Sequence, residues 1–279
     1  MIPFDFIYFR PETLKEATEI YNQLNNEGKK AVYFAGGSET ITMCRSNAIN
    51  PYAVIDIKNI PECHRLVIEN DYLVIGSLCT LNEINFSGLF KLLGLSCSRI
   101  ADHTNQCRIT IGGNLYGTII YRETSLPLLL SDADITIYGL SGSKTVPFNS
   151  IFDGKLNLKS GEIIVEIKIP LWATKARFFH IKKTQSEKID YPLDSMSAIC
   201  KDDFIRVAFS GICSYPFRSN KIETIINNHS LSCNERAEKA SEVLPENPYQ
   251  DVEGSSEYRK FVFIRTLEEL LEEWEHDKI

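Results

Sequence analysis

Two pairs of glycines are the residues of this sequence whose type and spacing best suit a ligand. Thr110-Ile111-Gly112-Gly113-Asn114 lies between two apolar stretches, and Ala35-Gly36-Gly37-Ser38 follows the strand-like run 31–34. Without a Cβ atom, backbone N–H groups can point into a shared concavity and hold an anion, while hydroxyl and amide side chains add donors at its rim. Each pair alone is more typical of a tight turn. Together they predict two loops that grip one diphosphate.

The other reactive side chains form no recognisable catalytic or metal-binding pattern. Five histidines and eight cysteines are scattered without a Cys-x-x-Cys motif, so we predict no catalytic residue, no metal site and reduced thiols. Glu123 lies nine residues after Asn114 and could accept hydrogen bonds from ribose hydroxyls, although a solvated glutamate at a helix start is the commoner meaning. Lys182 follows a predicted strand and could meet a phosphate, although single lysines usually lie in solvent.

Composition limits the classes of function that are open to the chain. Its 279 residues are 43% hydrophobic and 24% charged, as in soluble proteins of about two domains. The formal net charge of −7 argues against a general nucleic-acid binder. No apolar run is long enough for a membrane span, and the first residues do not resemble a signal peptide. We therefore expect a cytoplasmic protein whose partners are small molecules or other proteins.

The first part of the chain should position the two loops. A strand at 4–8, a helix from 10 to about 25 and buried strands at 31–34 and 53–57 predict a β-α-β unit with a mostly parallel sheet. We expect 38–51 to be an irregular link that passes the ligand. A new subdomain should begin near residue 60. Its predicted elements are a hairpin at 66–75, a helix capped by Thr80 and Glu83, a buried helix at 126–130, and strands at 134–138 and 163–169.

The pattern changes after residue 172. Segments 176–181, 195–200 and 204–213 predict a three-stranded antiparallel sheet, and helical periodicity at 221–228, 235–243 and 256–274 predicts helices that cover it. The predicted fold is therefore α+β. Its first domain spans 1–172, with subdomains at about 1–58 and 59–172, and its second domain spans 173–279.

Five stretches, taken together and in order, resemble the FAD-binding middle subunit of the molybdenum hydroxylases, the relatives of xanthine dehydrogenase and carbon monoxide dehydrogenase. They are Ala35-Gly36-Gly37-Ser38, Thr110-Ile111-Gly112-Gly113-Asn114, the run from Leu126 to Ala133, the strand from Glu162 to Pro170, and Ser255-Ser256-Glu257-Tyr258-Arg259. The resemblance covers essentially the whole chain. It implies a vanillyl-alcohol-oxidase-like FAD-binding domain in two subdomains, followed by a sheet-and-helix domain.

The resemblance also implies which residues hold FAD. Glu123 falls where the family has an acid that contacts the cofactor, and Lys182 falls where it has a lysine near the flavin. The two loops would hold the diphosphate and the ribityl chain. Their residues at matching positions are Phe34, Ala35, Gly36, Gly37, Ser38, Glu39, Thr40, Thr110, Gly112, Gly113 and Asn114.

The activity implied by the resemblance is electron relay. A molybdenum-cofactor subunit oxidises a substrate, an iron–sulfur subunit carries single electrons, and the flavin passes a hydride to NAD⁺. Three departures from the family pattern bear on this expectation. Gln106-Cys107 replaces a common Arg-Asn pair, the segment from Tyr116 to Arg122 is bulkier than usual, and Ser186 stands where an arginine is usual. The last change bears on whether NAD⁺ or another molecule is the acceptor.

Two other hypotheses remain open at this point. The chain could be a flavin-free scaffold that docks the partner subunits, with both glycine loops serving only as turns. It could instead be a free-standing flavoprotein, although the sequence nominates no base beside a flavin.

Overall fold

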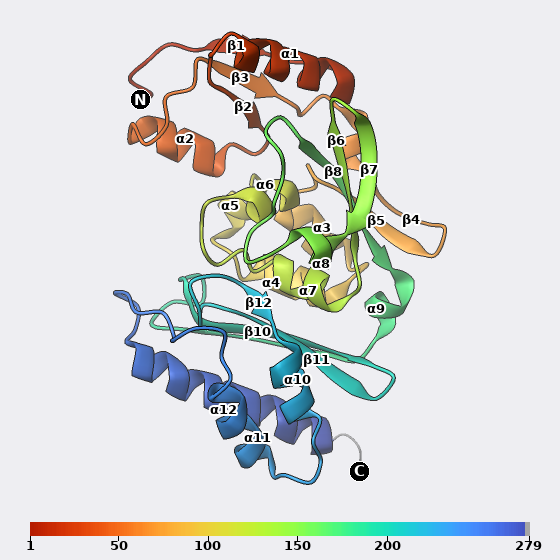
Figure 1. Ribbon diagram of the computed structural model, residues 1–279, viewed down its shortest axis with the longest axis vertical. Coiled ribbons are helices and arrows are strands. Elements are labelled where there is room, and N and C mark those ends of the chain that lie inside the picture. Colours follow the sequence, from red (N-terminus) through yellow and green to blue (C-terminus); the bar gives the residue numbers. More distant parts are fainter. Residues whose placement is uncertain (277–279) are drawn as a thin grey trace.

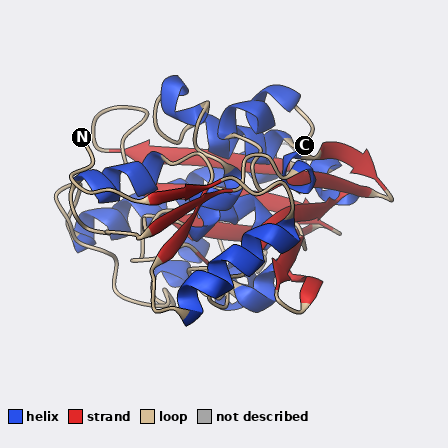
Figure 2. Cartoon of the chain, turned by 90° about the horizontal axis from the view of Figure 1, so that it is seen from above, coloured by secondary structure: helices blue, strands red, loops and turns tan. Residues whose placement is uncertain are grey.

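Three successive parts of the chain stack along the long axis of the molecule. The structure is a computed structural model that describes residues 1–276. Figure 1 shows the N-terminal part at the top, a larger helix-and-sheet part in the middle and the C-terminal part at the bottom. From above, the three parts overlie one another (Figure 2). Each part has its own sheet, as expected for an α+β fold.

The N-terminal part confirms the predicted β-α-β unit. Its elements are β1 (Ile7–Phe9), α1 (Leu14–Asn26), β2 (Ala31–Phe34), α2 (Ser38–Arg45) and β3 (Ala53–Asp56). The sheet has the order β1-β3-β2, and both pairings are parallel. Helix α2 corrects the prediction of an irregular link at 38–51. Gly37, with φ of 75°, turns the chain into this helix, a backbone event that hydrophobic periodicity does not reveal.

The middle part is built on a five-stranded antiparallel sheet of order β4-β5-β8-β6-β7. The predicted hairpin is present, and Thr80 and Glu83 form the predicted capping box of α3. The strands are β4 (Leu66–Glu69), β5 (Tyr72–Gly76), β6 (Asp134–Gly139), β7 (Gly142–Pro147) and β8 (Ile163–Pro170). The helices are α3 (Leu81–Ser87), α4 (Lys91–Ser98), α5 (His103–Gln106), α6 (Ile111–Tyr116), α7 (Ser125–Leu130), α8 (Phe148–Ile151) and α9 (Leu171–Lys175), with a 3₁₀ turn η1 (Pro61–His64).

The C-terminal sheet has four strands instead of the predicted three. Strands β9 (Phe178–Thr184), β10 (Pro192–Lys201) and β11 (Phe204–Ser210) are the expected antiparallel set. A two-residue strand, β12 (Phe217–Arg218), adds to β11 and is too short to show an alternating pattern. Helices α10 (Asn220–Ile226), α11 (Cys233–Ser241) and α12 (Ser256–His276) cover the outer face of this sheet (Figure 1).

Side chains on opposite faces of β10 pack into two different hydrophobic cores. Met196 and Ala198 belong to the core shared with α12, whereas Ile199 belongs to the core of the middle part. Successive strand residues point to opposite faces, so the sheet lies between the outer helices and the middle part. No helix within residues 1–276 combines the length and apolarity needed to cross a bilayer.

Candidate functional site

Tertiary structure brings the two glycine loops into direct contact. A Cβ atom on Gly36 would lie 1.8 Å from the carbonyl oxygen of Arg108 and 3.5 Å from the amide nitrogen of Thr110. The backbone of the first loop therefore rests on the segment that leads into the second. Only glycine permits so close an approach at position 36.

The first loop offers unused hydrogen-bond donors. Gly37 is the N-cap of α2 and has no side chain to cap the helix, so N–H groups in the first turn, which includes Ser38, Glu39 and Thr40, lack intrahelical acceptors. The hydroxyl of Ser38 is buried without a partner. A helix N-terminus with free N–H groups attracts anions. These groups form the part of the site that is chemically suited to a phosphate.

One aromatic side chain, Phe34, and one basic side chain, Lys58, pack against the first loop. The ring of Phe34, at the end of β2, occupies the space where Gly37 would carry a Cβ atom. The ammonium of Lys58 lies 4.3 Å from the centroid of that ring and 3.4 Å from the carbonyl oxygen of Ala35. Lys58 is also paired with the buried carboxylate of Asp56 at 2.7 Å. Sequence patterns did not mark Lys58, whose place beside the loop depends on the parallel strand pairing.

The sequence predicts that backbone N–H groups of the second loop hold an anion. In the structure these N–H groups already donate to other protein groups. The amides of Ile111 and Gly112 donate to the carbonyls of Cys79 and Ser77, both at 2.9 Å. The amide of Gly113 donates to the side-chain oxygen of Thr110 at 3.1 Å, as part of the N-cap of α6. The loop therefore presents a bare backbone surface instead of an N–H cradle. A Cβ atom at Gly113 would meet only the Thr110 hydroxyl, at 2.9 Å.

Asn114 and Glu39 brace the segment that follows the second loop. The side-chain oxygen of Asn114 accepts a 2.6 Å hydrogen bond from the Thr124 hydroxyl. The carboxylate of Glu39 accepts a 2.8 Å hydrogen bond from the backbone N–H of Thr118 and a second one from its hydroxyl. Glu39 thus ties α2 to the chain just beyond α6. A direct contact of Glu39 with FAD stays a prediction.

Glu123 and Lys182 lie together, enclosed where the middle and C-terminal parts meet. Their side chains are 5% and 2% exposed and form an ion pair at 3.2 Å. Lys182 also donates to the carbonyl of Arg99 at 2.7 Å, whereas the second carboxylate oxygen of Glu123 has no partner. Burial raises the pKa of Glu123, and the Lys182 ammonium opposes that rise. Because both groups are enclosed, their predicted contacts with FAD stay predictions and would need this junction to open.

Further polar groups at this junction were missed by sequence reasoning. His180 contacts the hydroxyl of Ser197 at 3.1 Å, and burial lowers the pKa of this histidine to about 4, so it is neutral near pH 7. The hydroxyl of Ser195, opposite Lys182 in the sheet, is buried without a partner. The available signal was a run of polar residues, Asp194, Ser195 and Ser197, within an otherwise apolar strand.

Asp194 makes stability depend on pH. Asp194 is fully buried, and burial raises its pKa from 3.8 to about 7, although the nearby Thr266 hydroxyl and the cations of Lys183 and Arg259 favour the charged form. The folded pKa exceeds the unfolded one, so the wild-type protein should lose stability as pH rises from 3.8 to about 7.

We predict that Asp194→Asn stabilises the protein at pH 8 by about 2 kcal/mol, because an amide carries no charge to desolvate. Near pH 4.5 the same substitution should bring no gain, since the aspartic acid is then neutral. Urea denaturation of both proteins at the two pH values measures this. If Asp194→Asn changed the free energy of unfolding equally at both pH values, the raised pKa would not belong to Asp194.

The structure shows where the residues that depart from the family pattern lie. The amide nitrogen of Gln106 donates to the carbonyls of Ser98, Ile100 and Ala101, each at 3.1 Å, and so ties down the end of α4. Cys107 is exposed, and Tyr116 is 62% exposed. Both side chains are therefore accessible to solvent.

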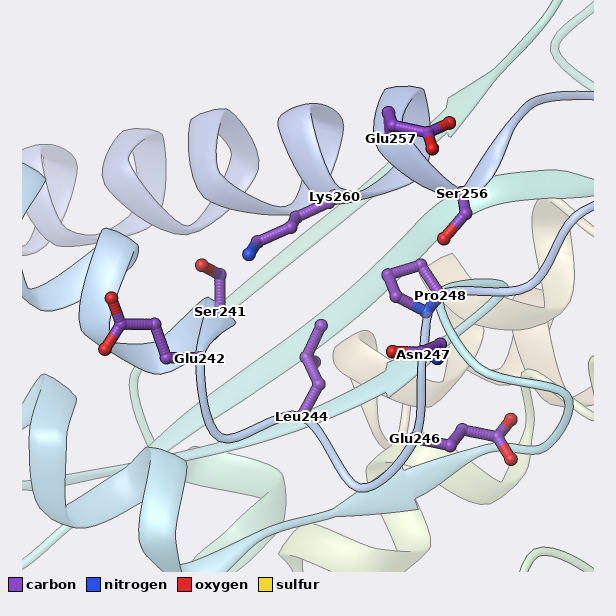
Figure 3. A pocket seen from close by; sticks show the side chains of 9 residues that line it. All are labelled: Ser241, Glu242, Leu244, Glu246, Asn247, Pro248, Ser256, Glu257 and Lys260. Atoms are coloured by element: carbon purple, nitrogen blue, oxygen red, sulfur yellow. The ribbon is translucent and has the colours of Figure 1, made fainter.

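An open hollow of about 440 Å³ lies elsewhere, between α11 and the start of α12. Figure 3 shows Ser256, Glu257 and Lys260 on one side and Ser241 and Glu242 on the other. None of the predicted site residues lines it. Within residues 1–276, no group of three or more histidine, cysteine or carboxylate side chains is arranged to hold a metal ion.

Comparison with protein families and sequences finds proteins that are similar to this chain. A family model described as the FAD binding domain in molybdopterin dehydrogenase matches residues 3–172. The chain is 30% identical over 179 residues to the carbon monoxide dehydrogenase medium chain of Hydrogenophaga pseudoflava, covering 62% of this chain and 61% of that relative. It is 24% identical over 222 residues to the nicotinate dehydrogenase FAD-subunit of Eubacterium barkeri, covering 76% and 72% of the two chains. The first alignment thus spans about three fifths of the relative's length.

Solved structures share the fold over nearly the whole chain. A chain of quinoline 2-oxidoreductase from Pseudomonas putida 86 superposes with a TM-score of 0.85 at 19% identity, covering 97% of this chain and 96% of the other. A chain of carbon monoxide dehydrogenase from Hydrogenophaga pseudoflava gives a TM-score of 0.83 at 24% identity, covering 96% of both. At these identities the likeness concerns the fold alone.

Proposed function

Because the chain belongs to the family of FAD-binding domains of molybdopterin dehydrogenases, we propose that it is the FAD-binding subunit of a molybdenum hydroxylase complex. In this role it relays electrons from an iron–sulfur subunit through FAD to NAD⁺ or another acceptor. Family membership agrees with the resemblance found in the sequence motifs. The substrate chemistry of such a complex belongs to a separate molybdenum-cofactor subunit.

The observation that carries the proposal is the uncapped start of α2 beside the bare backbone of the second loop. The N-terminus of α2 and the unpartnered Ser38 hydroxyl supply donors for a diphosphate. Gly36 keeps the two loops in contact, and Gly113 leaves room for a ligand to approach the second loop. These features fit the diphosphate of FAD, because free N–H groups at a helix N-terminus attract phosphates and glycine lets the ligand approach the backbone closely.

The protein's own residues bind and orient the cofactor in this proposal. The start of α2 and Ser38 would hold the diphosphate, and the free amide nitrogen of Asn114 would add a donor at the edge of the second loop. FAD, when bound, accepts electrons singly and delivers them in pairs. The pair Glu123–Lys182 would keep the C-terminal sheet seated against the middle part and so define the far end of the site.

The relatives and one residue of the chain bear on the partner subunits and the electron acceptor. The names "medium chain" and "FAD-subunit" of the relatives support a place in a multi-subunit enzyme. Ser186 stands where the family usually has an arginine, so the electron acceptor could be a molecule other than NAD⁺. The eight free cysteines are consistent with the cytoplasm, where thiols stay reduced.

An absorption spectrum of the purified chain, before and after addition of FAD, tests the proposal. A flavin band, with FAD identified in the extracted chromophore, would support it. A folded protein that neither carries nor takes up FAD would contradict it and favour the flavin-free scaffold. Turnover of a small substrate by the isolated chain would instead favour the free-standing flavoprotein.

Gly113→Val should abolish flavin retention in a protein that still folds. The branched side chain would displace the Thr110 hydroxyl and fill the surface that faces the ligand, so affinity should fall by about a hundredfold or more. Flavin content per mole of protein measures the effect. Gly94→Ala is the control, because its added carbon makes only an ordinary 3.4 Å contact with Asn85 within the helical region. Normal flavin content in Gly113→Val would refute the loop assignment.

A further inference from the structure

Arg122, in the segment between α6 and α7, is a buried cation in an uncommon backbone conformation. It is 8% exposed and has φ of 33°, a region that residues with side chains rarely adopt. Its Nε donates to the carbonyl of Gly117 at 3.0 Å, and its Nη1 donates to the carbonyl of Gly154 at 2.8 Å. Surrounding structure must hold such a residue in place, and conformations of this kind gather at functional sites.

Within the described residues 1–276, the guanidinium of Arg122 has no paired counter-ion. Among the side chains of residues 1–276, no carboxylate lies within ion-pair distance of it, and its Nη2 has no acceptor. Burial lowers the pKa of Arg122, and the more distant carboxylate of Glu39 acts in the opposite direction. A buried cation without a counter-ion is costly, so a nearby anion would be stabilised.

Arg122 lies beside the groups that form the candidate diphosphate site. The amide of Gly117, whose carbonyl binds the guanidinium, donates to the carbonyl of Gly113 at 2.9 Å. The next residue, Thr118, is held by Glu39 from the first turn of α2. Arg122 is therefore connected to the second glycine loop through the residue Gly117, and to the first loop through the Gly117–Thr118 peptide and Glu39.

We propose that Arg122 supplies the positive charge that balances the diphosphate of bound FAD, and that Glu39 competes with this diphosphate for the same cation. This inference rests on the proposed FAD binding. In the free protein the carboxylate of Glu39 partly offsets the charge of Arg122. In the bound protein two phosphate charges take over that role, and Glu39 becomes a repulsive neighbour that limits affinity.

The first test compares ligands that differ in the diphosphate. Dissociation constants for FAD, ADP and adenosine are measured for the wild type and for Arg122→Gly, which accepts a positive φ without strain. The variant should bind FAD and ADP about tenfold more weakly or worse, with adenosine binding unchanged. Arg122→Lys, which keeps the charge, should recover part of the loss. Arg265→Gln, at an exposed position of α12, also removes one positive charge but lies away from the site, and it serves as control.

The second test uses Glu39→Gln, which keeps an acceptor for the two donors of Thr118. This variant should bind ADP about threefold to tenfold more tightly than the wild type, because a negative charge beside the diphosphate is removed. The gain should be smaller when Arg122 is already glycine, which a double-mutant cycle measures. Unchanged or weaker ADP binding by Glu39→Gln would overturn the inference, even if the Arg122 variants fold poorly.

The outcomes separate this inference from the proposed function. A wild-type protein that binds no FAD contradicts both. A wild-type protein that binds FAD, together with folded Arg122 variants of equal affinity for FAD and ADP, overturns the role of Arg122 alone. Equal losses for ADP and adenosine would also overturn it, because the effect would then not concern the phosphates.

Discussion

Lys182→Met should lower the free energy of unfolding by about 3–5 kcal/mol, a large share of the stability of a typical domain. The substitution removes the ion-pair partner of the enclosed Glu123 carboxylate and leaves only the more distant charge of Arg99 to offset it. One oxygen of that carboxylate already lacks a partner, so the remaining hydrogen bonds cannot compensate. Urea denaturation near pH 7, followed by circular dichroism, measures the loss.

A neighbouring lysine on the same strand provides the matched control. Lys183 pairs with Glu269 at 3.0 Å, but its side chain is 42% exposed and that of Glu269 is 50% exposed. Lys183→Met should therefore cost at most about 1 kcal/mol. The double variant Lys182→Met with Glu123→Leu should recover most of the loss, because it removes the stranded charge. If Lys182→Met lowers the free energy of unfolding no more than Lys183→Met does, the Glu123–Lys182 ion pair does not stabilise the junction.

Gly36→Ala should both destabilise the protein and remove its flavin. The added carbon would lie 1.8 Å from the carbonyl oxygen of Arg108, which is backbone and cannot rotate away. The two glycine loops must then separate, at a cost of about 3 kcal/mol in stability. The distance between the α2 N-terminus and the second loop changes with them, so FAD affinity should fall by about a hundredfold or more. Flavin content and thermal unfolding are measured on the same samples.

Gly139→Ala separates this effect from the general cost of replacing a glycine. Its added carbon would meet only the flexible side chain of Glu162, at 3.2 Å. We expect near wild-type stability and flavin content for this control. Full flavin content in Gly36→Ala would show that the contact between the loops is not needed for binding.

Much of the fold is predictable from local patterns. The continuous apolar run at β3 indicates a buried parallel strand, and the Thr80–Glu83 capping box marks the start of α3. Helix α2 and strand β12 are missed for physical reasons. The first starts at a glycine in a left-handed conformation instead of an apolar repeat, and the second has only two residues.

For the candidate site, too, some features follow from the sequence and others only from the tertiary structure. The sequence by itself determined the family and the two glycine pairs, because these depend on residue types in order along the chain, whereas diphosphate binding by the pairs stays a prediction. Tertiary structure alone decided that N–H groups of the second loop donate to Thr110, Ser77 and Cys79, so that in the proposed site the donors would come from α2. It also decided that Glu123 and Lys182, 59 residues apart, neutralise each other. Hydrogen bonds and ion pairs between distant segments depend on packing, which no local pattern of residue types records.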